Sequence, residues 1–155
     1  MAAADHRPRV LFLCTGNSCR SQMAEGWARH LLADTVDACS AGTDPHGLNP
    51  LAVAAMREAG VDTSGHTSKT IDACDPDTLD LVVTVCASAH ETCPVFPGTA
   101  RVVHRGFDDP PRLARDAGSD DEALPHYQRV RDEIRDFVRT LPDLLCQPTA
   151  GRTAP

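Results

Sequence analysis

The chain reads Val10-Leu-Phe-Leu-Cys14-Thr-Gly-Asn-Ser-Cys-Arg20-Ser21 near its N-terminus. Residues 10–13 are a continuous β-type run, which is typical of a strand buried on both faces. From Ser21 onward, pairs of apolar residues recur four positions apart and lay one stripe along a helix: Met23, Ala24, Trp27, Ala28, Leu31 and Leu32. The stretch therefore predicts a strand that leads into a helix through a loop of seven residues, 14–20.

Outward from this unit, further strand and helix signals alternate along the chain. Strands are expected at residues 36–40, 79–85 and 101–104. Asn49-Pro50 supplies an N-cap and a first-turn proline for a helix that runs to Glu58 and ends at Gly60. Because alternating strands and helices form βαβ units, we expect an α/β fold: a single domain with a four-stranded parallel open sheet and helices on both faces.

The last part of the chain carries one more helix signal. Apolar residues at positions 127, 130, 134, 137, 138 and 141 share one helical face, and Pro142 closes that helix. Residues 118–122 are interpreted as a solvated loop. We expect a flexible N-terminus at residues 1–8, the folded domain at 9–145 and a disordered tail at 146–155.

Charge and hydropathy exclude several classes of function. The 15 Lys and Arg residues against 22 Asp and Glu residues give a net charge of −7, and no basic run occurs. We therefore expect neither a nucleic acid nor an anionic membrane as partner, since both require a cationic face. The longest unbroken apolar stretch, residues 10–14, is far shorter than the roughly 20 residues of a membrane span. It is also too short for a secretory signal, so a cytoplasmic location is expected.

The chain has seven cysteines, an odd number for an apparently intracellular protein. Reducing compartments disfavour a static disulfide framework, so burial, metal binding or catalysis has to account for them. Cys39, Cys74 and Cys146 are interpreted as small buried apolar residues. The other four cysteines occur in patterns that carry chemistry.

The loop of residues 14–20 has the composition of an oxyanion site. Its small residues can turn their backbone N–H groups inward as an anion nest, and the following helix adds its positive end. The expected oxyanion-binding residues are Cys14, Thr15, Gly16, Asn17, Ser18, Cys19 and Arg20. Arg20 clamps an oxyanion with two donors, and the same field favours the thiolate form of Cys14, a nucleophile.

Ser21 either hydrogen-bonds the Cys14 sulfur or simply caps the helix. Cys19 is interpreted as a loop-filling residue rather than a protective thiol. The alternative for the whole loop is an ordinary strand-to-helix turn that happens to hold a cysteine and an arginine.

A second pair of thiols follows the strand at 79–85. Cys86 and Cys93 are seven residues apart, which is about 10.5 Å of helical rise, whereas a disulfide requires Cα atoms within about 7 Å. A disulfide between them would unwind the intervening segment and act as a redox switch with a change of shape. The alternatives are a zinc site that uses Cys86, His90 and Cys93 but lacks an evident fourth ligand, or two unrelated thiols.

A carboxylate follows the strand at 101–104. Asp109 can act as the general acid that protonates a departing oxygen, although Asp-Asp-Pro is also an ordinary turn. In open parallel sheets, ligands bind beyond the carboxyl ends of the strands. Since Cys14, Cys86 and Asp109 each follow a separate strand, we expect them to converge at that edge of the sheet.

The run Cys14-Thr-Gly-Asn-Ser-Cys-Arg-Ser-Gln-Met-Ala-Glu-Gly-Trp27 resembles thioredoxin-coupled arsenate reductases, which share the fold of low-molecular-weight protein tyrosine phosphatases. The resemblance spans roughly residues 8–140, and the Cys86/Cys93 pair is its most discriminating part. Further matching motifs are Ser40-Ala-Gly, His46-Gly, Asn49-Pro, His66-Thr-Ser, Leu81-Val-Val-Thr, Gly106-Phe-Asp-Asp-Pro110 and Gln128-Arg-Val-Arg-Asp-Glu-Ile134.

The resemblance implies a monomeric enzyme that reduces arsenate by a three-thiol relay without a cofactor. Arsenate, with phosphate or sulfate as competing oxyanions, binds in the 14–20 loop, Cys14 attacks arsenic, and Asp109 protonates the leaving hydroxide. Cys86 then attacks Cys14 and arsenite leaves. Cys93 attacks Cys86, and thioredoxin reduces the resulting Cys86–Cys93 disulfide.

Some members of this family bind potassium near the loop, with ligands that correspond here to Asn17, Glu25, Ser40 and Thr67. A further acidic ligand corresponds to position 69, which is Lys69 in this chain. An ammonium group at that position repels a cation or takes its place. We therefore expect no tight potassium site, and no metal is part of the expected site.

Two other functions stay open at the level of sequence. A protein tyrosine phosphatase would use the same Cys14, Arg20 and Asp109 and hydrolyse a phosphocysteine with water. Phosphatases of this size place aromatic residues around the pocket, whereas here Pro111 follows the Asp-Pro pair and the whole chain has six aromatic residues. Weak phosphatase side activity is compatible with a reductase.

An arsenic sensor would bind arsenite without turnover, but the chain offers no basic DNA-reading helix, which disfavours a repressor.

Overall fold

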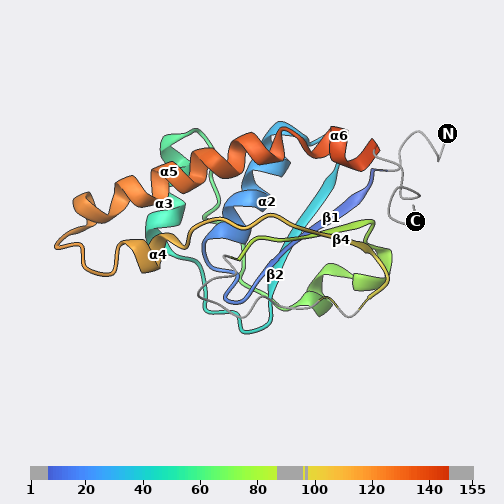
Figure 1. Cartoon of the computed structure of the whole chain (residues 1–155), viewed down its shortest axis with the longest axis horizontal. Coiled ribbons are helices and arrows are strands. Elements are labelled where there is room, and N and C mark those ends of the chain that lie inside the picture. The colour runs from blue at the N-terminus through green and yellow to red at the C-terminus, as the bar shows by residue number, and fades with distance from the viewer. Residues whose placement is uncertain (1–6, 87–95, 97, 147–155) are drawn as a thin grey trace, which may run out of the picture.

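A computed structural model describes residues 7–86, 96 and 98–146 of the chain. Four parallel strands form one sheet in the order β2-β1-β3-β4 (Figure 1). The strands are β1 Arg9–Cys14, β2 Asp37–Gly42, β3 Leu81–Thr84 and β4 Arg101–His104. The four-stranded parallel sheet predicted from the sequence is confirmed.

β1 lies in the middle of the sheet, hydrogen-bonded to β2 on one side and to β3 on the other. Its four apolar residues, 10–13, are all 0% exposed. Val10 and Phe12 belong to the core on one face, and Leu11 and Leu13 to the core on the opposite face. The uninterrupted apolar run is therefore a consequence of both faces being covered.

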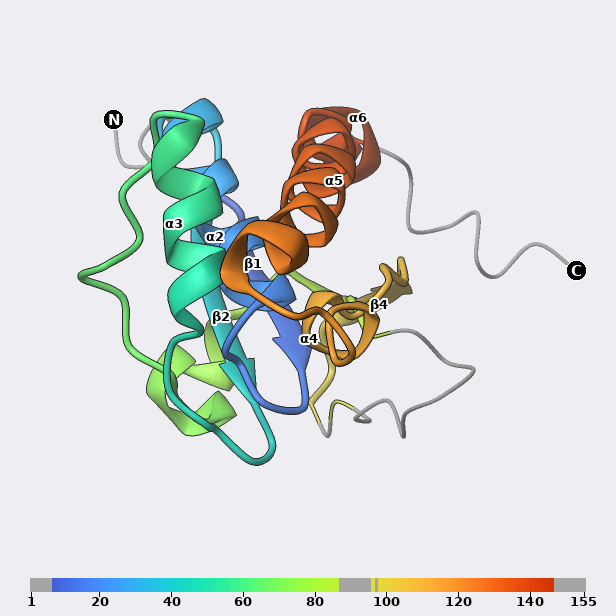
Figure 2. The same cartoon turned by 90° about the vertical axis from the view of Figure 1, so that its left-hand side faces the viewer.

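The α-helices and the 3₁₀ helices cover different faces of the sheet (Figure 2). The helices α2 (Arg20–Leu31), α3 (Pro50–Glu58) and α5 (Asp120–Val138) pack together over the face that carries Val10 and Phe12. The 3₁₀ helices η1 (Ile71–Cys74) and η2 (Pro76–Thr78) lie at the opposite face, where Cys74 and Leu79 pack with Leu11 and Leu13. Among the helices of the described residues, none combines the length and apolar character that crossing a bilayer requires.

The helix at the end of the chain differs from its prediction at both ends. α5 begins at Asp120, so residues 120–122 form its first turn and not a solvated loop. Ser119 caps this turn by accepting a hydrogen bond from the Glu122 backbone N–H at 3.3 Å, and the acidic first turn suits the positive end of the helix. α5 ends at Val138, ahead of Pro142, which lies instead in the first turn of α6 (Leu141–Cys146), where its missing N–H costs no helical hydrogen bond.

The prediction that Cys39 and Cys74 are buried is confirmed, but they are not unpaired thiols, and the prediction of burial is wrong for Cys146. Cys39 in β2 and Cys74 in η1 form a disulfide with a Cα–Cα distance of 6.2 Å. Cys146, at the end of α6, is an exposed free thiol. Positions 39 and 74 are 35 residues apart, so their proximity depends on how the chain folds back over the sheet.

Candidate active site

A cavity of about 260 Å³ lies beyond the carboxyl end of β1. Its lining combines most of the 14–20 loop with one residue of the 44–49 segment and two at the start of the helix that follows β4: Cys14, Thr15, Gly16, Ser18, Cys19, Arg20, His46, Asp109 and Pro111. Asp109 directly precedes the short helix α4 (Pro110–Leu113), which follows β4. The fold thus brings the predicted nucleophile, clamp and acid together in one cavity.

Hydrogen bonds around Cys14 point protons at its sulfur. The thiol is free and buried. The Asn17 backbone N–H donates to Cys14 Sγ at 3.3 Å, and the Ser21 hydroxyl lies 3.0 Å from the same sulfur. Asn17 Nδ2 donates to Ser21 Oγ at 2.9 Å, which leaves the Ser21 proton available to the sulfur. Two hydrogen-bond donors therefore face this sulfur.

Hydrogen bonds accepted by its backbone carbonyl groups hold the 14–20 loop in place. Backbone N–H groups of the 44–49 segment donate to three of these carbonyls at 2.9 Å each: Asp44 to Thr15, His46 to Gly16 and Asn49 to Ser18. Since the N–H and C=O of one peptide unit point in opposite directions, this arrangement turns loop N–H groups toward the cavity. Asn17 has φ +48°, the left-handed conformation that completes an anion-binding nest.

Arg20 joins the loop to the segment that follows β4. Its Nη1 donates to the Phe107 carbonyl at 3.0 Å, and its Nη2 lies 3.6 Å from Asp109 Oδ1. The Arg20 side chain is buried and that of Asp109 is partly exposed. The Asp109 side chain does not cap α4, although Asp109 occupies the capping position. The guanidinium group is thus fixed beside the cavity, with the carboxyl group at its mouth.

Cys19 lines the same cavity, but its environment opposes ionisation. Burial first, and then the negative charge of Asp109, raise the pKa of Cys19 well above that of an ordinary thiol. Arg20 acts in the opposite direction without cancelling the effect. A protonated thiol is a poor nucleophile, so this environment disfavours Cys19 as the reactive sulfur of the loop.

Behind the loop lies a buried carboxylate, that of Glu25, at 2% exposure. Ser40 Oγ donates to Glu25 Oε1 at 2.6 Å, and Lys69 Nζ lies 3.4 Å from the same oxygen. Lys69 Nζ also donates to the Thr67 carbonyl at 3.2 Å. The ammonium group of Lys69 therefore contacts groups that correspond to potassium ligands in the resemblance.

Gln22 and His66 belong to this region, although sequence reasoning assigned them no role. Gln22 Nε2 donates to Asn17 Oδ1 at 3.0 Å and to the Thr67 carbonyl at 2.9 Å, and it thereby supports the loop from below. His66 Nδ1 lies 3.0 Å from Gln22 Oε1. Burial lowers the pKa of His66 more than the nearby Glu25 raises it, so the ring is neutral and donates from Nδ1. The sequence does hold one signal for Gln22: it is a polar residue directly after Ser21, at a position where the helix is buried.

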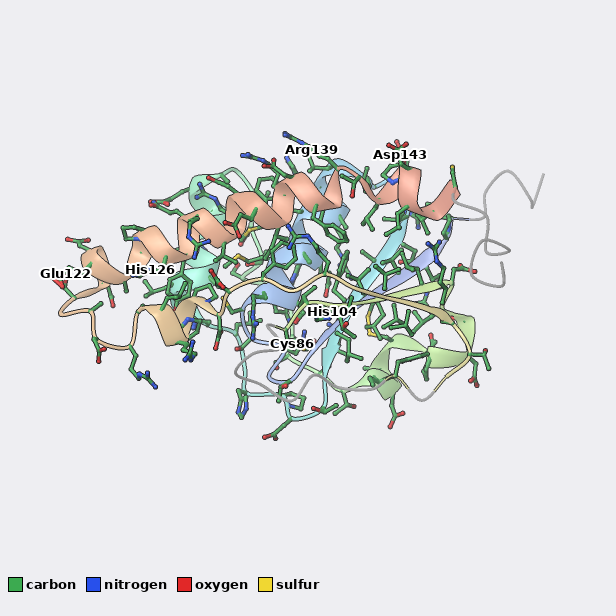
Figure 3. All side chains as sticks on the ribbon, in the orientation of Figure 1. Cys86, His104, Glu122, His126, Arg139 and Asp143 are labelled. Carbon is green, nitrogen blue, oxygen red and sulfur yellow. A yellow bond between two sulfur atoms is a disulfide. The ribbon has the colours of Figure 1, made fainter. Side chains whose placement is uncertain are left out.

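Cys86 follows β3, the strand adjacent to β1, with Thr84 paired to Leu13. It is fully buried and disulfide-bonded, whereas Cys14 is free, so the disulfide of Cys86 does not involve Cys14. Cys86 is not among the described residues that line the cavity. Figure 3 labels it together with His104, which ends β4.

His90 and Cys93 lie outside the described residues, so the predicted Cys86–Cys93 disulfide stays a prediction. A disulfide-bonded Cys86 has no thiolate to offer a metal, which disfavours the zinc alternative.

Comparison with known proteins places the chain in a family. The family model described as low molecular weight phosphotyrosine protein phosphatase matches residues 9–147. The arsenate reductase of Bacillus subtilis (strain 168) is 53% identical over 135 residues, which cover 84% of this chain and 95% of that protein.

Two solved structures are also similar. The structure titled "An arsenate reductase in the phosphate binding state" aligns with a TM-score of 0.73 and 31% identity, covering 89% of this chain and 98% of that one. A thioredoxin-dependent arsenate reductase of Corynebacterium glutamicum aligns with a TM-score of 0.66 and 26% identity, covering 92% of this chain and 63% of that one. The chain therefore belongs to the low molecular weight phosphotyrosine protein phosphatase family, among its arsenate reductase members.

Proposed function

We propose that this protein reduces arsenate to arsenite with its own thiols and is recycled by thioredoxin. The observation that carries the proposal is the cavity in which the Cys14 sulfur, the Arg20 guanidinium and the Asp109 carboxyl meet. Relatives named arsenate reductase, about half identical to this chain, support the substrate. The thioredoxin-dependent neighbour from Corynebacterium glutamicum supports the reductant.

In the first step, the Cys14 thiolate attacks arsenic of a bound arsenate. An As–OH bond breaks, and a proton from Asp109 converts the departing hydroxide to water. Arg20 and the loop N–H groups hold the remaining oxygens and stabilise the charge that develops on them. The product is a Cys14–arsenic(V) adduct.

In the second step, the Cys86 thiolate attacks the Cys14 sulfur. A Cys14–Cys86 disulfide forms, and the electron pair of the breaking S–As bond reduces As(V) to As(III), which leaves as arsenite. The Cys93 thiolate then attacks Cys86, which restores the Cys14 thiolate and leaves a Cys86–Cys93 disulfide. A dithiol of thioredoxin supplies two electrons and two protons to reduce that bond.

The relay requires the sulfur of Cys86 to reach that of Cys14. Cys14 ends β1 and Cys86 lies two residues beyond the end of β3, and neighbouring strands of a sheet are about 4.8 Å apart. Cys86 is buried and is not among the described residues that line the cavity, so the second step requires its sulfur to reach that of Cys14. A free Cys14 together with a disulfide-bonded Cys86 is the pattern expected after the relay and before thioredoxin acts.

A phosphatase is the second candidate, because the family model bears that description. The cavity supports it less well. None of the described residues that line it is Phe, Trp or Tyr, so an aryl group would find no aromatic wall, whereas a small inorganic oxyanion needs none. We expect only weak cleavage of p-nitrophenyl phosphate by Cys14.

The decisive experiment measures arsenate-dependent NADPH consumption with thioredoxin and thioredoxin reductase. Cys14→Ser, Cys86→Ser and Cys93→Ser should each abolish multiple turnovers, whereas only Cys14→Ser should abolish p-nitrophenyl phosphate cleavage. Cys146→Ser, which removes an exposed free thiol, is the control and should retain both activities. Multiple turnovers by Cys93→Ser would contradict the relay, and stoichiometric arsenic binding by the wild type without turnover would favour a sensor.

A further inference from the structure

A disulfide outside the proposed relay joins two segments that support the 14–20 loop from behind. Cys39 lies in β2 and Cys74 in η1, at 8% and 1% exposure. The cross-link closes a chain segment of 35 residues that contains α3 and the 66–70 segment. Both sulfurs belong to the core on the face of the sheet that the 3₁₀ helices cover.

The β2 side of the cross-link touches the loop directly. Ser40, the next residue, donates to Glu25. Gly42, at the end of β2, is pressed so closely against the loop that an added Cβ would lie 2.3 Å from the Thr15 carbonyl oxygen and 2.9 Å from the Asn17 nitrogen. Any shift of this strand end relative to β1 therefore moves the loop.

The η1 side reaches the same loop through the 66–70 segment. The Lys69 backbone N–H donates to Asn17 Oδ1 at 2.9 Å, and the Lys69 carbonyl accepts from the Gly42 N–H at 2.8 Å. Ser68 Oγ donates to the Gly16 carbonyl at 3.1 Å. The segment continues directly into η1, so the disulfide anchors the chain only a few residues beyond these contacts.

We infer that the Cys39–Cys74 disulfide is a positioning cross-link: it holds the 66–70 segment against the end of β2 and thereby fixes Asn17 and the oxyanion geometry of the 14–20 loop. The inference rests on the proposed function, and it assigns this pair a role outside the relay. Opening the bond would take two electrons and two protons from a dithiol whose thiolate has to reach one of the sulfurs. Burial of both sulfurs denies that approach to thioredoxin, so the bond persists while the relay disulfide is reduced in each cycle.

The cross-link can be tested first in the unmodified enzyme. After turnover with arsenate and the thioredoxin system, free thiols are alkylated under native conditions and located by mass spectrometry. Cys39 and Cys74 should be alkylated only after denaturation and chemical reduction, whereas the exposed Cys146 should be labelled at once. Alkylation of Cys39 and Cys74 in the native enzyme would overturn the inference.

The second test uses phosphate, an inert oxyanion, and does not depend on arsenate chemistry. Cys39→Ser/Cys74→Ser is compared with Cys146→Ser by thermal unfolding and by phosphate titration calorimetry. Loss of the cross-link should lower Tm by roughly 5–12 °C and raise the phosphate Kd by about 3- to 10-fold, roughly the effect of a loosened hydrogen-bond contact. Unchanged phosphate affinity in the folded double variant would overturn the inference. Absence of phosphate binding in the wild type would instead count against the proposed function.

Discussion

The two sides of the 14–20 loop differ in solvent exposure and in how their polar groups are paired. The front is a cavity lined by Cys14, Arg20 and Asp109, of which only Asp109 is partly exposed, and it holds the groups to which we assign the chemistry. The back surrounds the buried Glu25 carboxylate, which Ser40 and the partly buried Lys69 contact. Within the described part of the chain, no buried side-chain nitrogen or oxygen lacks a hydrogen-bond partner.

The difference shows how this fold separates chemistry from positioning. A loop with inward N–H groups and a left-handed residue is strained unless its surroundings determine its shape. Hydrogen bonds at the back supply that support, so the front can be arranged for the transition state before substrate binds. Changes at the front should therefore affect rates, and changes at the back should affect stability first.

The largest effect is expected for Arg20→Lys at the front. Lysine keeps the charge but cannot donate to Phe107 and to a bound oxyanion from one planar group, so kcat/KM for arsenate should fall roughly 10³-fold. Coupled NADPH consumption measures the loss, and an unchanged Tm shows that the fold is intact. A variant within tenfold of the wild type would mean that the guanidinium group does not clamp the substrate.

For Asp109→Asn we expect a smaller loss of activity, which affects kcat and does not weaken the binding of the oxyanion. Removal of the acid should lower kcat for arsenate about 10²-fold. Phosphate affinity should stay equal or improve, because a negative charge beside the anion is lost. Steady-state kinetics with phosphate titration calorimetry separates the two quantities. Weaker phosphate binding with unchanged kcat would assign Asp109 to binding rather than to proton transfer.

At the back of the loop, Lys69→Met should act mainly on stability. The substitution removes one of the cations that pair with the buried Glu25 carboxylate, while Arg29 still lies 2.9 Å from it. The free energy of unfolding should therefore fall by about 1–3 kcal/mol. Urea unfolding measures it. Arg57→Met is a matched control, because its ion pair with Asp62 is exposed.

The same site predicts how the protein responds to potassium. With the Lys69 ammonium group in place, Tm should be the same in potassium and sodium chloride at equal ionic strength. Lys69→Asp removes the competing cation and should make Tm higher in potassium than in sodium. A wild-type Tm that rises specifically with millimolar potassium would contradict the expectation drawn from Lys69.

The smallest effect concerns pH. Burial lowers the pKa of His66 below its ordinary value of 6.5, so the unfolded chain binds a proton more readily than the folded one. The contribution of this group to stability is complete above pH 6.5 and is lost progressively as the pH falls toward the pKa of the folded state, by at most about 1.4 kcal/mol per pH unit. Tm measured from pH 7.5 to 5.5 should fall less in His66→Gln than in the wild type. Identical slopes would show that His66 does not titrate differently in the two states.

Much of the fold followed from local patterns. The apolar run of β1 and the paired stripe of α2 determine the strand-loop-helix unit, and the Asn49-Pro50 signal marked the start of α3 at Pro50. The start of α5 was missed even though Ser119 and Glu122 have the spacing of a capping box, because the run of acidic residues suggested solvent rather than a first turn.

The sequence by itself indicated which residues could do chemistry: the thiol of Cys14 at the end of the first strand, the guanidinium of Arg20 at the start of the next helix, and the carboxyl group of Asp109 in the segment after the fourth strand. Parallel strands end at one edge of a sheet, and Cys14, Arg20 and Asp109 line one cavity there, whereas Cys86, expected at the same edge, is not among the described residues that line it. Only the tertiary structure decided that Cys39 meets Cys74 and that Lys69 reaches Glu25. Those contacts join positions 35 and 44 residues apart through the path of an irregular segment, which depends on the packing of the whole core and follows no local periodicity.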